Sequence, residues 1–182
     1  MRVKQRRHRM HANPFTVRHD IASPDWPVIF GRAAPFAIDI GFGPGRFVVE
    51  LARRHPEWNV IGVEIRQHFV DMANASAAAT GLPNMHAVLA NANLHFNALV
   101  PDRSVAFVSV NFPDPWFKHR HHKRRVINDA WLPILLRKLQ PGAEVHFMTD
   151  YAVLGRETAL LLERQPALEN LDGPGGFALS ST

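Results

Sequence analysis

The stretch Phe36-Ala37-Ile38-Asp39-Ile40-Gly41-Phe42-Gly43-Pro44-Gly45 joins a short apolar run to a glycine-rich loop. The apolar run predicts a buried strand, and the residues from Arg46 to about Arg54 predict a helix with one apolar side. Glycines between a strand and a helix let the backbone approach a ligand closely. Because the helix N-terminus also offers free N–H groups, the loop is a candidate site for a polar or anionic ligand.

The spacing of the loop glycines narrows the class of ligand. The dinucleotide fingerprint G-x-G-x-x-G would need glycine at position 46, which is Arg46, so an NAD site is disfavoured. Asp39-x-Gly41-x-Gly43-x-Gly45 instead resembles the acid-x-G-x-G-x-G pattern of class I S-adenosylmethionine-dependent methyltransferases. Glu64 ends the next predicted strand, where such folds place a carboxylate on the ribose hydroxyls. The alternatives are a tight turn without a ligand and a surface acid at position 64.

Strands and helices alternate along the rest of the chain. This predicts an α/β domain with a mostly parallel sheet covered on both faces. We expect strands at 36–40, 60–63, 85–89, 105–110 and 145–148, a short segment at 94–99, and helices at 46–54, 67–79, 129–139 and 152–163. Asp129 is the expected N-cap of the third of these helices, and Pro141-Gly142 its expected end. We divide the chain into a basic arm and lead-in (1–35), the domain (36–163) and a loosely ordered tail (164–182).

A second informative stretch begins at the end of the strand predicted over 105–110. Val110-Asn111-Phe112-Pro113-Asp114-Pro115-Trp116 leads through Phe117 into residues 118–125, which are all basic or histidine. A carboxylate at the carboxyl end of a buried strand, beside a cationic loop, predicts a site for a polar and anionic partner. Trp116 and Phe117 either stack on a base or hold the loop against the body; we expect one of them to do the latter.

Positive charge is concentrated in two segments. The net charge is +5, but residues 1–19 hold six Lys/Arg and residues 118–125 hold five, whereas all 16 Asp/Glu lie elsewhere. A cationic pair of segments on an acidic body favours a polyanion such as nucleic acid over two solvated loops.

Composition excludes other classes of site. There are no cysteines, so we expect neither disulfides nor a thiolate nucleophile, and His119, His121 and His122 lie among five cations, where a metal site is disfavoured. No apolar run approaches the ~20 residues that span a bilayer. We therefore expect no metal, no membrane partner and a cytoplasmic location.

The second stretch resembles a known signature. Phe112-Pro113-Asp114-Pro115-Trp116-Phe117-Lys118, with the basic residues that follow, closely resembles the bacterial tRNA (guanine-N7)-methyltransferases. Ile40-Gly41-Phe42-Gly43, Gly62-Val63-Glu64 and Thr149-Asp150 also match, so the resemblance covers about residues 36–163. It implies a Rossmann-like class I methyltransferase fold, S-adenosylmethionine as methyl donor, and a guanine in the tRNA variable loop as target. The protein is expected to be a monomer or homodimer.

The resemblance also assigns roles to residues. It implies that Asp114 is catalytic and that Lys118 and Asp150 contact the substrate; Asp150 is otherwise a plain helix cap. The implied cofactor-binding residues are Asp39, Gly41, Gly43, Gly45, Glu64, Asn91 and Asp114. We expect Lys118 and the other cations of the basic block, Arg120, Lys123, Arg124 and Arg125, to hold tRNA phosphates. Guanine N7 has a lone pair and no proton, so we expect Asp114 to anchor the base rather than to remove a proton.

Two features depart from the family pattern. Asn91 stands where the family usually has Asp, although an amide oxygen can also accept a hydrogen bond from adenine. The chain ends at Ser180-Ser181-Thr182, so we expect the family's C-terminal antiparallel strands to be missing or incomplete. This leaves open a shortened homologue that binds tRNA, and possibly S-adenosylmethionine, with little or no catalysis. A methyltransferase acting on exocyclic amines is a third reading, but these enzymes do not usually carry the basic block.

Overall fold

The computed structural model describes residues 20–177, so the basic arm predicted over residues 1–19 and the last five residues of the predicted tail lie outside it. Its centre is a five-stranded sheet in the order β3-β2-β1-β4-β5, and all four strand pairings are parallel. The strands are β1 (Phe36–Ile40), β2 (Asn59–Glu64), β3 (Met85–Leu89), β4 (Val105–Asn111) and β5 (Leu139–Met148). The predicted parallel α/β class is confirmed.

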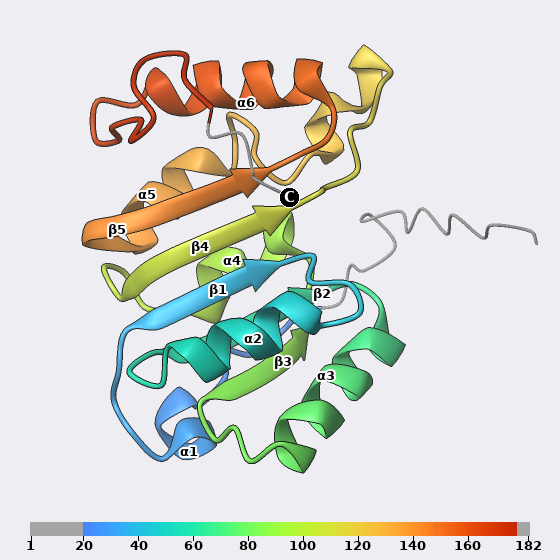
Figure 1. Ribbon diagram of the computed structural model, residues 1–182, viewed down its shortest axis with the longest axis vertical. Coiled ribbons are helices and arrows are strands. Elements are labelled where there is room, and N and C mark those ends of the chain that lie inside the picture. The colour runs from blue at the N-terminus through green and yellow to red at the C-terminus, as the bar shows by residue number, and fades with distance from the viewer. Residues whose placement is uncertain (1–19, 178–182) are drawn as a thin grey trace, which may run out of the picture.

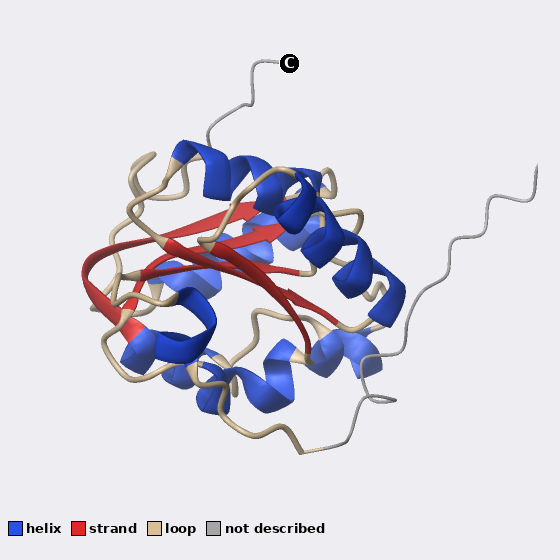
Figure 2. Cartoon of the chain, turned by 90° about the horizontal axis from the view of Figure 1, so that it is seen from below, coloured by secondary structure: helices blue, strands red, loops and turns tan. Residues whose placement is uncertain are grey.

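Helices cover both faces of the sheet. They are α1 (Trp26–Phe30), α2 (Arg46–Arg54), α3 (Gln67–Ala79), α4 (Ala92–Leu99), the short 3₁₀ helix η2 (His119–Arg124), α5 (Leu132–Lys138) and α6 (Ala152–Glu163). Figure 1 shows α2 in front of the sheet and α4 and α5 behind it, and Figure 2 shows the same layers from below. Within residues 20–177, no helix is long and apolar enough to cross a bilayer.

Side chains alternate along the strands and form two separate cores. In β1, Ile38 and Ile40 belong to the core that includes residues of α1, α4 and α5, whereas Ala37 belongs to the core shared with α2 and α3. Every residue of β1 and β2 is buried. Burial on both faces explains why these strands read as continuous apolar runs instead of alternating patterns.

The glycine loop after β1 is seated on β2 by a close contact. Gly41 and Gly43 have φ angles of 72° and 55°, which L side chains adopt only with strain. Between them, Phe42 turns into the core and is only 7% exposed. A Cβ atom added to Gly62 would lie 2.8 Å from the Phe42 ring, so glycine at this position of β2 makes room for the loop to pack.

The predicted helix over 129–139 has different ends in the structure. It begins at Leu132, and Asp129 is not its cap. Its N-cap is Trp131, which makes no side-chain capping bond, and Asn128 stabilises the turn before the helix, since its side-chain oxygen accepts hydrogen bonds of 3.0 Å from the N–H groups of Ala130 and Trp131. An amide oxygen three residues before Trp131 therefore satisfies N–H groups that the adjacent carboxylate was expected to satisfy.

The same helix ends at Lys138, before the expected Pro141-Gly142 stop, and β5 starts at Leu139 rather than at 145. The register between β4 and β5 jumps from Val105↔Leu139 to Phe107↔Glu144. Pro141-Gly142 therefore lies in an irregularity of the strand, which lets the strand pairing continue on both sides of a residue that has no N–H to donate.

The lead-in also differs from prediction, because residues 26–30 form a short helix. Pro27 lies in its first turn, where a missing N–H is tolerated, and the Asp25 side chain accepts from the N–H of Val28. Trp26 is 4% exposed and donates from its indole nitrogen to the Leu99 carbonyl oxygen at 2.5 Å. This contact ties α1 to the end of α4.

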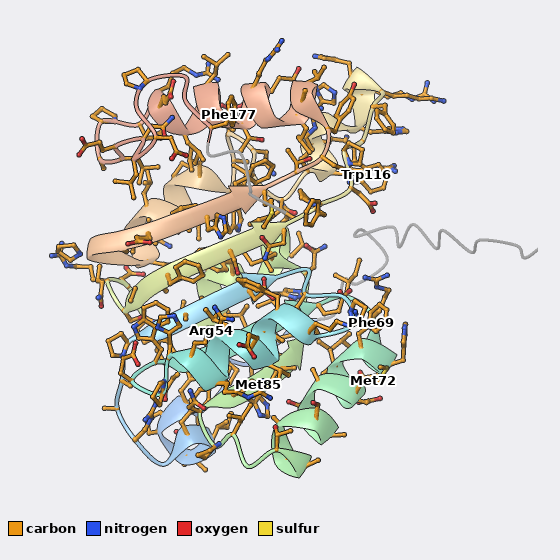
Figure 3. All side chains as sticks on the ribbon, viewed as in Figure 1. Arg54, Phe69, Met72, Met85, Trp116 and Phe177 are labelled. Atoms are coloured by element: carbon orange, nitrogen blue, oxygen red, sulfur yellow. The ribbon has the colours of Figure 1, made fainter. Side chains whose placement is uncertain are left out.

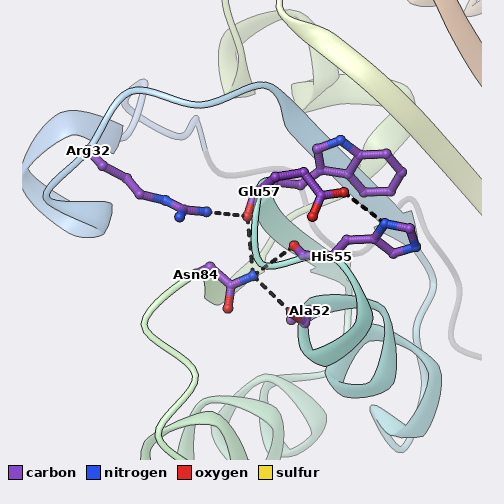
Figure 4. Close-up of polar contacts among 6 residues, drawn as sticks. Arg32, Ala52, His55, Glu57 and Asn84 are labelled. Carbon is purple, nitrogen blue, oxygen red and sulfur yellow. Dashed lines mark hydrogen bonds and ion pairs between the residues drawn. The ribbon is translucent and has the colours of Figure 1, made fainter.

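The amino ends of the strands are held by a polar cluster (Figure 4). The Asn84 side-chain nitrogen lies 2.9, 3.1 and 3.2 Å from the carbonyl oxygens of Ala52, His55 and Trp58. Arg32 donates to the same Trp58 oxygen at 2.7 Å. These contacts fix the turn between α2 and β2 at the end of the sheet opposite to the carboxyl ends of the strands.

Candidate functional site

A pocket lies at the carboxyl ends of β1, β2 and β4. In a parallel sheet this is the end at which ligands bind. Phe69 and Trp116, which flank this region, both lie on the side toward which the strand arrows point in Figure 3. The polar and aromatic side chains of its lining are Glu64, Arg66, Asn91, Asn93, Asn111, Phe112, Asp114, Trp116 and Arg124. Three residues that the sequence singled out in different segments, Glu64, Asn91 and Asp114, are therefore brought together.

Glu64 is a buried side chain of the pocket that accepts several hydrogen bonds. It is 2% exposed, and its carboxylate accepts from the N–H groups of Gly43 at 3.0 Å, Ile65 at 2.8 Å and Arg66 at 3.1 Å. The Arg66 guanidinium adds two more bonds of 3.1 Å, Nε to Oε1 and Nη2 to Oε2. The contact from Gly43 joins the glycine loop directly to the end of β2, which makes Glu64 more than a surface acid.

Asp39 lies beside this group and is almost fully buried. Its Oδ1 accepts from the Ser109 hydroxyl at 2.7 Å, whereas its Oδ2 has no hydrogen-bond partner within residues 20–177. Burial raises the pKa of Asp39 to about 7; the Ser109 hydrogen bond opposes the rise and the negative charge of Glu64 adds to it. A buried acid with one free oxygen is suited to a cationic ligand, which would favour its ionised form.

Asn91 acts first as a helix cap. It is 2% exposed, and its side-chain oxygen accepts from the N–H of Asn93 at 3.0 Å at the start of α4. A carbonyl oxygen has a second lone pair, so capping does not exclude a ligand contact.

Asn111 is a pocket residue that sequence reasoning missed. Both side-chain polar atoms of Asn111 are buried and lack a hydrogen bond of good geometry within the described chain. Its position, two residues after Ser109 on the same face of β4, was the available signal.

The loop after β4 is strained and carries its aromatic residues in different ways. Phe112 and Trp116 have φ angles of 49° and 44°, a region that side chains other than glycine rarely adopt. Trp116 is half-buried against η2, with the Arg124 guanidinium carbon 5.0 Å from its ring and the His121 ring 6.0 Å away, edge-on. Phe117 is 69% exposed and touches Tyr151 only edge-on, at 5.0 Å between ring centroids. Trp116 therefore joins the loop to η2, whereas Phe112 and Phe117 are the exposed aromatic side chains of the loop.

Asp114 is held within this loop. It is an exposed residue in the lining of the pocket, between two prolines that limit the backbone. Backbone strain of this kind clusters at functional sites and persists only where the surroundings hold it. Asp114 thus lines the same pocket as the buried Glu64, but from an exposed position.

The basic block divides into two groups. Lys118, Arg120 and Lys123 are exposed. Arg125 is turned inward instead, with a side chain that is 12% exposed; it donates to the Pro115 carbonyl oxygen at 3.1 Å and pairs with Glu157 of α6 at 2.6 Å. Arg125 therefore joins the loop to α6, and its expected role in holding a tRNA phosphate stays a prediction.

The remaining expected site residues lie outside the pocket lining. Gly45 is the N-cap of α2, with a φ of 85°, and packs against Ala73 of α3. Asp150 is exposed beyond β5, and the cap of α6 is Tyr151. In the part of the chain that the structure describes, no three His, Asp or Glu side chains are grouped as metal ligands would be.

Comparison with known proteins identifies the family. A family model described as "Putative methyltransferase" matches residues 33–175. The tRNA (guanine-N(7)-)-methyltransferase of Synechococcus sp. (strain JA-2-3B'a(2-13)) is 38% identical over 161 residues, which cover 87% of this chain and 67% of the relative. The enzyme of the same name from Synechocystis sp. (strain ATCC 27184 / PCC 6803 / Kazusa) is 40% identical over 149 residues, 78% of this chain and 70% of the relative. The chain thus spans about two thirds of the length of these relatives.

Solved structures agree on the fold. A variant of the 16S rRNA (adenine(1408)-N(1))-methyltransferase from Catenulisporales acidiphilia, solved with its cosubstrate SAM, has a TM-score of 0.54 and 24% identity. The match covers 82% of this chain and 66% of that one, which shows a class I methyltransferase fold. With a family model over most of the chain and close relatives of one name, the chain belongs to the tRNA (guanine-N7)-methyltransferase family.

Proposed function

We propose that the pocket at the carboxyl ends of β1, β2 and β4 transfers the methyl group of S-adenosylmethionine to N7 of a guanine in the variable loop of tRNA. The observation that carries this proposal is the meeting of Glu64 and Asp114 in one pocket, beside exposed cations. The names of the relatives suggest the target, and we place the reaction in the cytoplasm.

The side chains present fit the methyl donor. Glu64 offers a buried carboxylate to a pair of ribose hydroxyls, and the free Oδ2 of Asp39 suits the positive charge of an amino-acid ammonium group. Asn91 lines the pocket and carries an amide oxygen of the type that accepts from an adenine amino group, and the buried Asn111 amide lies in the same pocket. These side chains thus offer acceptors to the groups of S-adenosylmethionine that donate, and the Asn111 amide can also donate.

The reaction needs little from the protein beyond positioning. S-adenosylmethionine supplies a methyl group that is electrophilic because it is bound to a sulfonium. As the N7 lone pair forms the new C–N bond, the S–C bond breaks and positive charge passes from sulfur to the base. No proton leaves N7, so a general base is not required, and in-line placement and charge stabilisation remain. Asp114 accepts from the N–H edge of the guanine and offsets the charge that develops on it.

The surface beside the pocket suits a polyanion with unpaired bases. Lys118, Arg120 and Lys123 are exposed and present flexible charges to phosphates. Phe112 and Phe117 are 59% and 69% exposed, and aromatic faces of this kind stack on unpaired bases. Single-stranded loops are the usual targets of sequence-specific RNA recognition, which is consistent with a variable-loop guanine.

A transfer assay tests the proposal. The protein is incubated with methyl-labelled S-adenosylmethionine and unmodified bulk tRNA, and the product is mapped with a reagent that cleaves at 7-methylguanosine. We expect label at one guanine of the variable loop. Binding of tRNA without transfer, or label at another atom, would contradict the proposal.

Asp114 is tested separately by Asp114→Asn. We expect a fall in kcat of about 100-fold or more, because a neutral amide neither anchors the N–H edge as well nor offsets charge. Affinity for S-adenosylhomocysteine should change far less, since the buried Glu64 of the pocket and Asp39 beside it are left unaltered. Glu57→Gln, which changes an exposed acid at the far end of the sheet, is the matched control and should leave kcat unchanged. A near-normal kcat in folded Asp114→Asn would remove this residue from the mechanism.

A further inference from the structure

Arg66 makes an unusual contact for a residue at the rim of a ligand pocket. Its side chain is 32% exposed, yet its guanidinium meets both oxygens of the buried Glu64 carboxylate at 3.1 Å, one nitrogen to each oxygen. Its guanidinium carbon also lies 4.3 Å from the centre of the Phe69 ring, on the first turn of α3. Two side chains thus hold the guanidinium in place.

A carboxylate binds a vicinal diol in the same way as it binds an arginine side chain. In both cases two parallel donors, N–H groups of the guanidinium or O–H groups of a ribose, each reach one carboxylate oxygen. The backbone N–H groups of Gly43, Ile65 and Arg66 already occupy three further acceptor positions of Glu64. With three backbone and two guanidinium donors, five donors already point at the two oxygens, more than the roughly four lone-pair sites of a carboxylate, so the guanidinium and a diol cannot both bind.

We propose that Arg66 is a displaceable plug of the nucleoside end of the pocket, which competes with the ribose diol of S-adenosylmethionine for the Glu64 carboxylate. The inference rests on the proposed methyl-donor site. Because the backbone donors remain when Arg66 swings away, Glu64 keeps three hydrogen bonds during the exchange. Because the Arg66 side chain is 32% exposed, its guanidinium can move toward solvent when a diol takes its place.

The plug has a defined consequence for selectivity. A ligand with both ribose hydroxyls can replace the two donors of Arg66, whereas a ligand without them cannot and leaves Glu64 paired with Arg66. The competition therefore lowers affinity for every diol-bearing ligand by a constant factor. A ligand that lacks the two hydroxyls does not compete with Arg66 for Glu64, so its affinity is not lowered in this way.

The test measures binding by titration calorimetry, which does not depend on methyl transfer. The probes are S-adenosylhomocysteine and its analogue that lacks the 2′ and 3′ hydroxyls of the ribose. The variants are Arg66→Ala and Arg66→Lys, where lysine can reach one carboxylate oxygen but not both. Arg53→Ala, which removes an exposed arginine–carboxylate pair on α2, is the control.

We expect Arg66→Ala to bind S-adenosylhomocysteine about fivefold more tightly than the unaltered protein, with Arg66→Lys between the two. Affinity for the diol-free analogue should change by less than about twofold, and Arg53→Ala should change neither. Weaker binding in Arg66→Ala would show that Arg66 holds the ligand, and equal tightening for both probes would show a general charge effect; either result overturns the plug. If the unaltered protein binds no S-adenosylhomocysteine, the methyl-donor site itself is contradicted.

Discussion

The buried carboxyl group of Asp39 makes the free energy of unfolding depend on pH. Its carboxyl group is almost fully buried, and its pKa is raised from 3.8 to about 7, chiefly by burial. Below pH 3.8 the group is protonated in both the folded and the unfolded chain. Between pH 3.8 and 7 only the unfolded chain loses the proton, so this residue lowers the free energy of unfolding as pH rises, and the loss is complete above pH 7.

Asp39→Asn should therefore stabilise the chain in a pH-dependent manner. We expect the free energy of unfolding to rise by about 1–3 kcal/mol at pH 8 and by clearly less at pH 5, since about 1.4 kcal/mol corresponds to each unit of pKa shift. Urea unfolding at the two pH values measures both. Ser109→Ala removes the hydrogen bond that favours the ionised carboxylate, so it should have the opposite effect, with a larger loss at pH 8. A gain from Asp39→Asn that is equal at both pH values would contradict the raised pKa.

The sequence marked residues of the site best where a loop joined a strand to a helix. Glu64 and Asp114 were placed correctly in one pocket, because the carboxyl ends of parallel strands must meet. Ser109 and Asn111 were missed, because they lie inside β4 and look like ordinary strand residues until the sheet brings them beside Asp39, where both oppose the rise of its pKa. The inward turn of Arg125 depends on Glu157, a residue of another element, and no local pattern reveals such a partner.

The loop after β4 is connected to helix α6 by side-chain contacts. Arg125 donates to the Pro115 carbonyl within the loop and pairs with Glu157 on α6. Trp116 and Arg124 stack in the same region. The position of Asp114, one residue before Pro115, thus depends on a contact to a helix more than thirty residues away.

A comparison of two variants tests this coupling. Glu157→Gln and Arg125→Ala should each lower kcat about three- to tenfold, because both release the same contact, and the double variant should be no worse than the Arg125 variant. If Arg125 instead binds a tRNA phosphate, Glu157→Gln should leave kcat unchanged and should not weaken tRNA binding. Lys123→Ala is the control: it should alter the affinity for tRNA and leave kcat at saturating tRNA near normal.

Element boundaries were less predictable than element order. The alternation of strands and helices followed from apolar runs and glycine or proline breaks, and it is confirmed in the five parallel strands. The start of α5 was wrong because the capping side chain, Asn128, forms a turn over residues 128–131 and the helix begins only after it, at Leu132. The start of β5 was wrong because Pro141 usually ends a strand, whereas here a change in register accommodates it.

At the scale of the whole molecule, charge separates the pocket face from the rest. Lys118, Arg120 and Lys123 are exposed on the segment beside the pocket, whereas Arg53 and Arg54 pair with Glu50 on α2. Cations without a carboxylate partner can release counterions from RNA when they bind phosphates, which makes binding sensitive to salt. The exposed cations should therefore dominate the salt dependence of tRNA binding among the described residues.

The triple variant Lys118→Ala, Arg120→Ala, Lys123→Ala should make the plot of log association constant for tRNA against log salt concentration less steep, by about 2 in the magnitude of its slope. Filter binding of tRNA over a range of salt concentrations gives the slope. The double variant Arg53→Ala, Arg54→Ala removes two cations at a distance from the pocket and should leave the slope unchanged. Equal changes in both variants would mean that net charge, and not this surface, sets the interaction.

The most direct test of the central claim, transfer to guanine N7, changes the substrate instead of the protein. Two tRNA transcripts are compared, one with guanine and one in which 7-deazaguanine replaces guanine throughout, with labelled S-adenosylmethionine as donor. The account predicts methyl transfer to the first transcript and none to the second, because the second has no N7 lone pair, with comparable binding of both. Transfer to the 7-deazaguanine transcript would contradict the account.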